Sequence, residues 1–482
     1  MTREPRPHLA AERRKEMRRI LLRLAAAAVF LTPCIPVHGQ SLPPGDFNVR
    51  SYGAVADGTS DDTSAIQKAM DACAAQGGGV VTLPAGKYLI KTHLNIPPAV
   101  TLEGVWRAAP TVQKYHRVEG DPASGPELTG TVLLAVEGAG RDDGTPFITL
   151  NTNSTLKGVT IFYPDQKKTD PPVPYPWTIA SAGADNVSIV DVLLVNPYQA
   201  VDFGSRTSGR HSIRNLYGQP LRKGLLVDLC LDVGRLENIH FWPFWTAADG
   251  QDSPVAKYML EHGEAFIFGR SDWEYVSNCF ALGYRVGMKF VRSHQGGPFE
   301  GGGNYLLTQS GADLCDIAVL VEEVQGHSGI SFSNSQIFGD IIVKETNNGM
   351  VRFTGCGLFG TIKASNGTGL ARIAGRGRVS FSNCHFYAIY RAFQAPYLIQ
   401  VAEGGRISIT GSLFINDWDA PYNRTPIVLE AGVRSAVITG NEFYGPAEIV
   451  DRTMGAAIIR DNLFETETHP PAAASSPGQD PQ

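Results

Sequence analysis

The sequence predicts an all-β protein folded as one single-stranded parallel β-helix, a solenoid of stacked coils that begins with a capping helix. Three observations predict this fold. A short motif recurs along the chain, an amphipathic helix precedes the first strands, and 52 Gly and 31 Pro among 482 residues, with only 18% charged residues, suit many short strands joined by turns. We expect the β-helix to span residues 45–468 as one domain.

The stretch Phe47–Gly104 predicts the cap and the first strands. Ser60 or Asp61 can accept hydrogen bonds from the free N–H groups of a helix near residues 61–75. An apolar stripe follows at helical spacing, and its members are Ala65, Ile66, Ala69, Met70 and Cys73. Glycines at 77–79 end the helix before strands expected at 80–83 and 88–90. Such a helix is typical of a cap over the open edge of a solenoid.

The same stretch resembles the N-terminal signature of the pectate-lyase-like, or glycoside hydrolase family 28-related, right-handed β-helix proteins. The matching words are YGA at 52–54, DG at 57–58, DDT at 61–63, AI at 65–66, GGG at 77–79 and PAG at 84–86. The resemblance implies a right-handed β-helix, but the same cap precedes hydrolases, lyases and phage tail proteins. This chain departs from the family's hydrolases in having Tyr198-Gln199 where they carry an Asp-Asp pair.

A motif of Asn, Gly or Asp, then an apolar or small residue, a free position and an apolar residue recurs through the chain. Its copies begin at Gly158, Asp191, Asn215, Asn238, Asn334, Gly355, Asn383, Gly411, Gly440 and Asp461, and from Asn334 they are 21, 28, 28, 29 and 21 residues apart. Each copy is expected to mark one coil. Cys356 and Cys384 occupy the slot of Val159 and Ile239, so we expect buried free thiols there rather than a disulfide.

The two ends of the chain lie outside the predicted β-helix. Residues 1–39, with Met17 as an alternative start, have the basic, apolar and small-residue segments of a signal peptide, which predicts export to the periplasm or the extracellular space. The apolar run is too short to span a bilayer, so no membrane span is expected after its removal. The tail 469–482 is predicted to be disordered.

Extra residues interrupt the repeat at 105–130, 246–273 and 292–312, and we expect them to leave the β-helix as insertions. Long insertions in a regular scaffold often carry function. The net charge of −5 gives no electrostatic case for nucleic-acid binding.

Three polar residues precede strands that can be aligned coil on coil: Gln199, Arg222 and Arg285. Equal positions in neighbouring coils lie roughly 4.8 Å apart, so we expect a polar ladder, with Asp202 and Lys289 beside it. Arginines beside hydrogen-bonding groups suit the carboxylates of acidic sugars. The alternative is an ordinary solvated face.

Aromatic and acidic residues crowd the same region. Trp242, Trp245 and Trp273 could stack on sugar rings, or could pack an insertion onto the β-helix. Asp272 and Glu274, two apart on a predicted strand, are expected to share one face. With Asp316 they are the candidate catalytic acids, because glycoside hydrolysis needs two carboxylates roughly 5–9 Å apart.

These patterns predict an exported carbohydrate-active enzyme that cleaves a polysaccharide, with a uronate-containing chain as one option and hydrolysis slightly favoured. The alternatives are a lyase that acts by β-elimination, and a non-catalytic glycan-binding or surface protein. A hydrolase would need no cofactor and no metal, whereas a lyase could use Ca²⁺. The sequence leaves the cofactor and the oligomeric state open.

Overall fold

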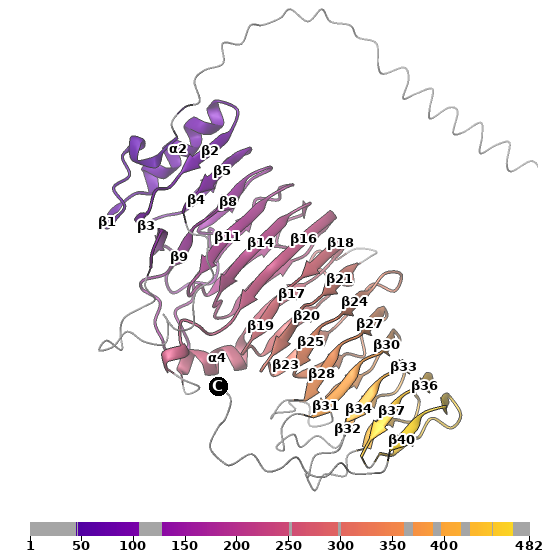
Figure 1. Ribbon diagram of the computed structural model, residues 1–482. Helices are drawn as coiled ribbons and strands as arrows, with labels where there is room; N and C mark the ends of the chain where they lie inside the picture. The colour runs from indigo at the N-terminus through magenta and orange to yellow at the C-terminus, as the bar shows by residue number, and fades with distance from the viewer. Residues whose placement is uncertain are drawn as a thin grey trace, which may run out of the picture. The chain divides into compact units, whose positions relative to one another are not determined.

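The computed structural model describes residues 45, 47–105, 128–249, 253–296, 300–360, 370–388, 397–415, 425–445 and 447–465. The predicted signal peptide (1–39), nearly all of the predicted insertion 105–130 and the tail 469–482 lie outside these residues. Within the described chain, all the strand pairings are parallel and join strands of successive coils (Figure 1). This confirms the predicted parallel β-helix.

Each complete coil contributes to three stacks of strands. The first stack contains β2 (Gly79–Thr82), β5 (Val100–Glu103), β8 (Thr155–Lys157), β11 (Ser188–Leu194), β14 (Ser212–Gly218), β16 (Cys230–Phe241), β18 (Ser271–Ser277), β21 (Tyr305–Thr308), β24 (Ile330–Ser333), β27 (Met350–Thr354), β30 (Arg378–Ser382), β33 (Arg406–Thr410), β36 (Ser435–Thr439) and β39 (Ala457–Arg460). The short β13 (Ser208–Gly209) pairs with the start of β16.

The second stack continues from the first through the long strands β11, β14 and β16, so the two stacks form one 27-stranded sheet. Its other members are β1 (Asp57–Asp61), β3 (Gly86–Ile90), β6 (Thr131–Ala135), β9 (Thr160–Phe162), β19 (Phe280–Leu282), β22 (Gly311–Asp313), β25 (Gln336–Phe338), β28 (Gly357–Gly360), β31 (His385–Ala388), β34 (Leu413–Ile415), β37 (Glu442–Tyr444) and β40 (Leu463–Glu465).

The third stack is a separate 13-stranded sheet. It contains β4 (Leu94–Ile96), β7 (Ile148–Leu150), β10 (Trp177–Ser181), β12 (Gln199–Phe203), β15 (Lys223–Val227), β17 (Glu264–Phe268), β20 (Val286–Phe290), β23 (Ile317–Val321), β26 (Asp340–Val343), β29 (Ala371–Ile373), β32 (Tyr397–Val401), β35 (Thr425–Leu429) and β38 (Ile449–Asp451).

The turn between the first and second stacks explains the recurring motif. The first residue of all ten copies has a φ between 48° and 68°, the left-handed region that Gly, Asn and Asp adopt most readily. Asn278 (φ 53°) and Gln309 (φ 49°) occupy the same turn in two further coils, which lie between Asn238 and Asn334. Residues 275–280 are recognisable from the sequence as a piece of a coil, but the motif count omits both turns because long loops spread their spacing and Gln309 is not a usual residue for this turn.

The cap has the predicted helix. Helix α2 spans Thr63–Ala75, and its buried residues are the predicted stripe Ala65, Ile66, Ala69, Met70 and Cys73. The carboxylate of Asp61 accepts the backbone N–H of Thr63 at 3.0 Å, as expected for one of the two predicted capping residues. The 3-10 helix η1 (Val49–Tyr52) packs beside α2, which contacts β2, β4 and β5.

Stacked side chains fill the interior of the coils. Phe414 stacks on Phe386 with ring centroids 4.5 Å apart and on Phe443 at 4.6 Å, so one ring lies above the next in consecutive coils. Cys356 and Cys384 are buried free thiols, as predicted, and the other described cysteines are also free.

Two predicted insertions are shorter than expected. Residues 264–268 of the interval 246–273 form β17, and in the interval 292–312 residues 305–308 form β21 and residues 311 and 312 begin β22. These segments fit the coils because their apolar residues align with buried neighbours, as Phe266 does with Leu225 and Met288. The excursion after β16 that remains carries η2 (Ala247–Asp249) and helix α4 (Pro254–His262). None of the helices in the described ranges is long and apolar enough to cross a membrane.

Candidate functional site

The outer surface of β11, β14, β16 and β18 carries a concentration of charged and aromatic side chains. We call it the polar face, and it consists of Asp185, Arg210, Arg214, Asp232, Arg235, Glu237, Arg270, Asp272, Trp273 and Tyr275. The strand register brings these residues together, because Arg214 is the partner of Glu237, and Arg235 the partner of Tyr275, in the adjacent coil. Alternation along each strand leaves the residues between them buried in the core.

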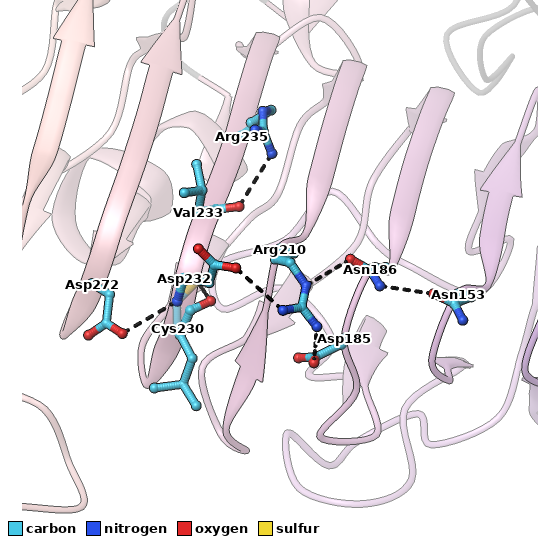
Figure 2. Close-up of polar contacts among 10 residues, drawn as sticks. Asn153, Asp185, Asn186, Arg210, Cys230, Asp232, Val233, Arg235 and Asp272 are labelled. Atoms are coloured by element: carbon cyan, nitrogen blue, oxygen red, sulfur yellow. Dashed lines mark hydrogen bonds and ion pairs between the residues drawn. The ribbon is translucent and has the colours of Figure 1, made fainter. Parts of the chain in front are cut away.

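Arg210 links three coils at one edge of the polar face (Figure 2). Its guanidinium donates to Asp185 at 2.5 Å, to Asp232 at 3.3 Å and to the amide oxygen of Asn186 at 3.1 Å. Arg210 has a left-handed φ of 53°, as do the stacked turn residues Asn153, Asn186 and Asp232 at 57° to 63°. The same backbone turn therefore presents four polar side chains in a row.

Asp272 extends this row into the next coil. One of its oxygens accepts from Arg270 at 2.7 Å, and the other accepts the backbone N–H of Asp232 at 3.4 Å. Asp185, Asp232 and Asp272 thus each have an arginine partner. Each of these carboxylates is therefore already engaged by a side chain of the protein.

Arg214, Arg235 and Glu237 differ from their neighbours. All three are exposed, and the ion pairs between described residues include none of them. The guanidinium of Arg235 donates only to the carbonyl oxygen of Val233, at 3.5 Å (Figure 2). Two arginines and one carboxylate are therefore available to an external ligand on adjacent strands.

Trp273 and Tyr275 are the exposed aromatic side chains of the polar face. They are 41% and 46% exposed, and their ring centroids lie 6.4 Å apart. Aromatic faces of this kind stack on sugar rings while their polar edges remain hydrated.

A fully buried polar cluster lies beneath the polar face. The Nε2 atom of His211 is 2.8 Å from Oε1 of Glu274, and its Nδ1 atom is 3.7 Å from Sγ of Cys230. All three side chains have no exposed surface. Burial alone would lower the pKa of His211, but the charge of Glu274 and the contacts with Cys230 outweigh burial and raise this pKa to about 10.

Glu274 corrects one prediction. Asp272 and Glu274 do not share a face, because the pairing of β18 with β16 shifts register between Cys230 and Val233. Two consecutive residues of β18, Asp272 and Trp273, therefore face solvent and Glu274 faces the interior. A buried Glu274 that is bonded to His211 and to Ser271 cannot contact a substrate at the surface.

The predicted polar ladder is also wrong. The structure pairs Gln199 with Lys223, and Lys223 with Glu264, so Arg222 is one position out of register with Gln199. Strand β17 lies between β15 and β20, so Arg222 and Arg285 belong to coils that are not neighbours. The predicted ladder places Arg222 and Arg285 in neighbouring coils because it assigns the residues of β17 to an insertion.

The predicted ladder residues have structural partners. Glu264 forms ion pairs with Arg285 and, at 3.1 Å, with Lys289, and Arg222 donates to the carbonyl oxygen of His262 at 2.6 Å. Gln199 is buried and donates to the carbonyl oxygens of Asp142 and Tyr175. Asp202 is buried and accepts the N–H groups of the turn at 204–205.

The remaining candidates are dispersed. Asp316 precedes β23 in the third stack, whereas Asp272 lies in the first stack, so the structure does not bring them together. Trp245 is 7% exposed, and Trp242 is packed against the core and stacked on His240 at 4.2 Å. Both tryptophans therefore pack the segment after β16 onto the β-helix, which is the predicted alternative to stacking on sugar rings. Asp272 and Trp273 are the predicted site residues that belong to the polar face.

Sequence reasoning missed Asp185, Arg210, Asp232, Arg214, Arg235 and Glu237. A signal for the last three existed: they lie one or three residues before a motif asparagine, Asn215 or Asn238, at positions where the alternation predicts an outward side chain. The row around Arg210 gave no comparable signal, because its left-handed turn, at Asn153, Asn186, Arg210 and Asp232, is a different turn from the one that the recurring motif marks.

Comparisons with known proteins agree on the fold. Residues 47–196 match the family described as rhamnogalacturonase A/epimerase, pectate lyase-like. The A-module of the mannuronan C-5 epimerase AlgE6 from Azotobacter vinelandii has a similar structure, with a TM-score of 0.52 and 16% identity over 88% of this chain and 100% of that one. At this level of identity the likeness concerns the fold.

Sequence relatives share only a short segment with this chain. Mannuronan C5-epimerase AlgE3 from Azotobacter vinelandii is 62% identical over 45 residues, which make up 9% of this chain and 2% of that protein. Plasmin and fibronectin-binding protein A from Streptococcus pneumoniae is 45% identical over 64 residues, 11% of this chain and 9% of that protein. The chain thus covers a small fraction of each of these relatives.

Proposed function

We propose that this chain, a parallel β-helix whose residues 47–196 match a pectate-lyase-like family, is a carbohydrate-active enzyme that modifies a uronate-containing polysaccharide on its polar face. The observation that carries the proposal is the group of Arg214, Arg235 and Glu237 beside the exposed rings of Trp273 and Tyr275. Similarity to proteins named as mannuronan epimerases supports an acidic polysaccharide as substrate.

Recognition would combine charge and stacking. Arg214 and Arg235 have no carboxylate partner among the described side chains, so a uronate carboxylate can occupy that role through paired N–H···O hydrogen bonds. Trp273 and Tyr275 lie on the strand next to Arg235 and would stack on adjacent sugar rings. A neutral polysaccharide would leave both arginines unpaired.

The chemistry best suited to this arrangement is proton removal at C5 of the bound uronate. Arginine contacts to the uronate carboxylate stabilise the negative charge that develops when the C5 proton leaves, and Glu237 is the carboxylate available to accept that proton. Loss of the O4 substituent then gives β-elimination, whereas return of a proton to the opposite face gives epimerisation.

Hydrolysis is the weaker candidate on this surface. It needs one carboxylic acid that carries a proton and a second carboxylate across the glycosidic bond. Asp185, Asp232 and Asp272 each form an ion pair with an arginine, so each would have to leave that partner to act at a glycosidic bond. This reverses the slight preference for a hydrolase that the sequence suggested.

Calcium does not fit the described residues of the polar face. Ca²⁺ requires several oxygen ligands, and Asp185, Asp232 and Asp272 are each bound to an arginine. The mechanism above therefore uses side chains alone.

A second candidate is a glycan-binding protein without catalysis. The short segment shared with a protein named for binding plasmin and fibronectin favours it, because related segments thus occur in a protein named for binding as well as in proteins named as enzymes. We further propose export from the cytoplasm, which rests on the signal-peptide pattern of residues 1–39.

The test is incubation with mannuronan, alginate, polygalacturonate and, as a neutral control, dextran. Absorbance from unsaturated uronates indicates elimination, a changed uronate composition without cleavage indicates epimerisation, and new reducing ends without absorbance indicate hydrolysis. Binding without conversion supports the second candidate. The proposal would be refuted if the protein neither binds nor converts any of the acidic polymers.

Variants connect the activity to the polar face. Glu237→Gln should abolish conversion but preserve binding, and Arg235→Gln should weaken binding. Arg378→Gln is the matched control, since Arg378 is also exposed on the first stack but lies in a distant coil. Equal effects of Arg235→Gln and Arg378→Gln would exclude the polar face as the site.

A further inference from the structure

His211, Cys230 and Glu274 form a group that the surface chemistry does not use. One ligand atom from each lies within 4.8 Å of the others, and none of the three side chains is exposed. Cys230 is the first residue of β16, Glu274 lies in β18 and His211 precedes β14, so three successive coils contribute to one point in the interior. Soft thiolate, imidazole and carboxylate together are a ligand set suited to zinc.

The distances suit a metal ion. Thiolate and imidazole ligands lie about 2.3 Å and about 2.0 Å from a tetrahedral zinc, which places sulfur and nitrogen roughly 3.5 Å apart. The observed Sγ to Nδ1 distance is 3.7 Å. The carboxylate of Glu274 contacts the other ring nitrogen, Nε2, at 2.8 Å, so it would turn from Nε2 toward the ion to become a ligand.

An independent observation concerns Ser208. It is the register partner of Cys230 in the adjacent coil, it is 2% exposed, and its hydroxyl has no hydrogen-bond partner. A buried hydroxyl without a partner has given up its hydrogen bonds to water without compensation. A cation beside Cys230 would give this oxygen a partner.

Catalysis by Cys230 is excluded by its burial, since no substrate can contact its sulfur atom. We propose that Cys230, His211 and Glu274 bind a structural zinc ion inside the β-helix, with the Ser208 hydroxyl as the neutral fourth donor. The ion would tie three consecutive coils together directly beneath the polar face. This site is independent of the proposed reaction at the surface.

Because the cluster is buried, loading is expected during folding. The full chain is produced in medium supplemented with zinc and in chelated medium, and the metal content is measured by mass spectrometry. One zinc per chain and a higher melting temperature in the supplemented protein are expected. The proposal would be overturned if the protein from supplemented medium contains no zinc and still binds none after refolding with excess zinc.

Cobalt identifies the ligands. Protein refolded with Co²⁺ should show the thiolate-to-cobalt charge-transfer band of a cysteine-ligated tetrahedral site. Cys230→Ala should abolish that band and the bound metal, and it leaves the His211–Glu274 pair intact, so the variant is expected to fold. Cys315→Ala, at another buried free cysteine, is the control and should change neither. Metal bound without the band, or retained by Cys230→Ala, would refute the assignment.

Discussion

Gly234 leaves the space that the carboxylate of Glu274 occupies: a Cβ atom on Gly234 would lie 2.3 Å from Oε2 of Glu274. The two residues are register partners in β16 and β18. A glycine in this strand thus permits a buried carboxylate in the neighbouring coil, and the position of Glu274 in turn fixes His211 at 2.8 Å.

Gly234→Ala should displace Glu274 and lower the free energy of unfolding by about 1–3 kcal/mol, as for other overpacked interiors. Urea unfolding measures the loss. Gly326→Ala is the control, because a Cβ there would meet only the carbonyl oxygen of Asn348, at 3.7 Å. Equal stability of the two variants would show that the Glu274 carboxylate is free to move.

Glu274→Gln should destabilise the metal-free protein by about 3–5 kcal/mol, because it leaves His211 without its buried counter-charge. The double variant with His211→Gln should lose less than the sum of the two single variants. Asp272→Asn, at an exposed position on the same strand, should change stability by less than about 0.5 kcal/mol. Thermal and urea unfolding of the four variants give the comparison. Additive losses would contradict the coupling.

The fold was accessible from sequence because its signals are local. A left-handed turn needs Gly, Asn or Asp, so each coil carries its own mark, and the apolar stripe of α2 follows from helical spacing alone. The polar face depends on relations between coils instead. The register shift that turns Asp272 outward and Glu274 inward has no signature within β18, and the alignment of Arg222 required knowledge that β17 intervenes.

Trp273→Ala and Tyr275→Ala should each weaken binding of the preferred acidic polysaccharide by about 2- to 10-fold through loss of ring stacking. Affinity electrophoresis in gels that contain the polymer gives the change. Met454→Ala removes a fully exposed apolar side chain from a distant coil and should leave the affinity unchanged. An equal loss in that control would mean that the effect is not specific to the polar face.

His240 should make the protein less stable in mild acid. Burial lowers its pKa to about 4, in a site stacked on Trp242 and edge-on to Phe280. Below about pH 6.5 the unfolded chain binds a proton at this histidine that the folded chain does not, so stability falls as the pH decreases toward 4, by at most about 1.4 kcal/mol per unit.

The measurement is the urea midpoint of wild type and His240→Gln between about pH 7 and about pH 4.5. The variant should lose less stability over this range. Parallel pH profiles of the two proteins would show that His240 is protonated in the folded state.

Gly440→Ala tests whether the motif turn requires a residue that readily adopts a left-handed φ. Gly440 has a φ of 68° and nothing lies within 4 Å of an added Cβ, so the substitution changes backbone strain alone. A loss of about 1 kcal/mol is expected for Ala and a smaller loss for Asn. Urea unfolding distinguishes them, and an Ala variant as stable as wild type would show that this turn tolerates any residue.

The left-handed turn between the first and second stacks also fixes which residues of each coil point inward and which point outward. Because the backbone returns to the same conformation at Asn238, Asn278 and Gln309 despite loops of very different length between them, the inward and outward positions of each coil are counted anew from that residue. Segments such as the one that carries α4 can therefore grow or shrink without rotating the side chains of the next coil. The loops beside the polar face can therefore change in sequence and length while the strands that form the polar face keep their geometry.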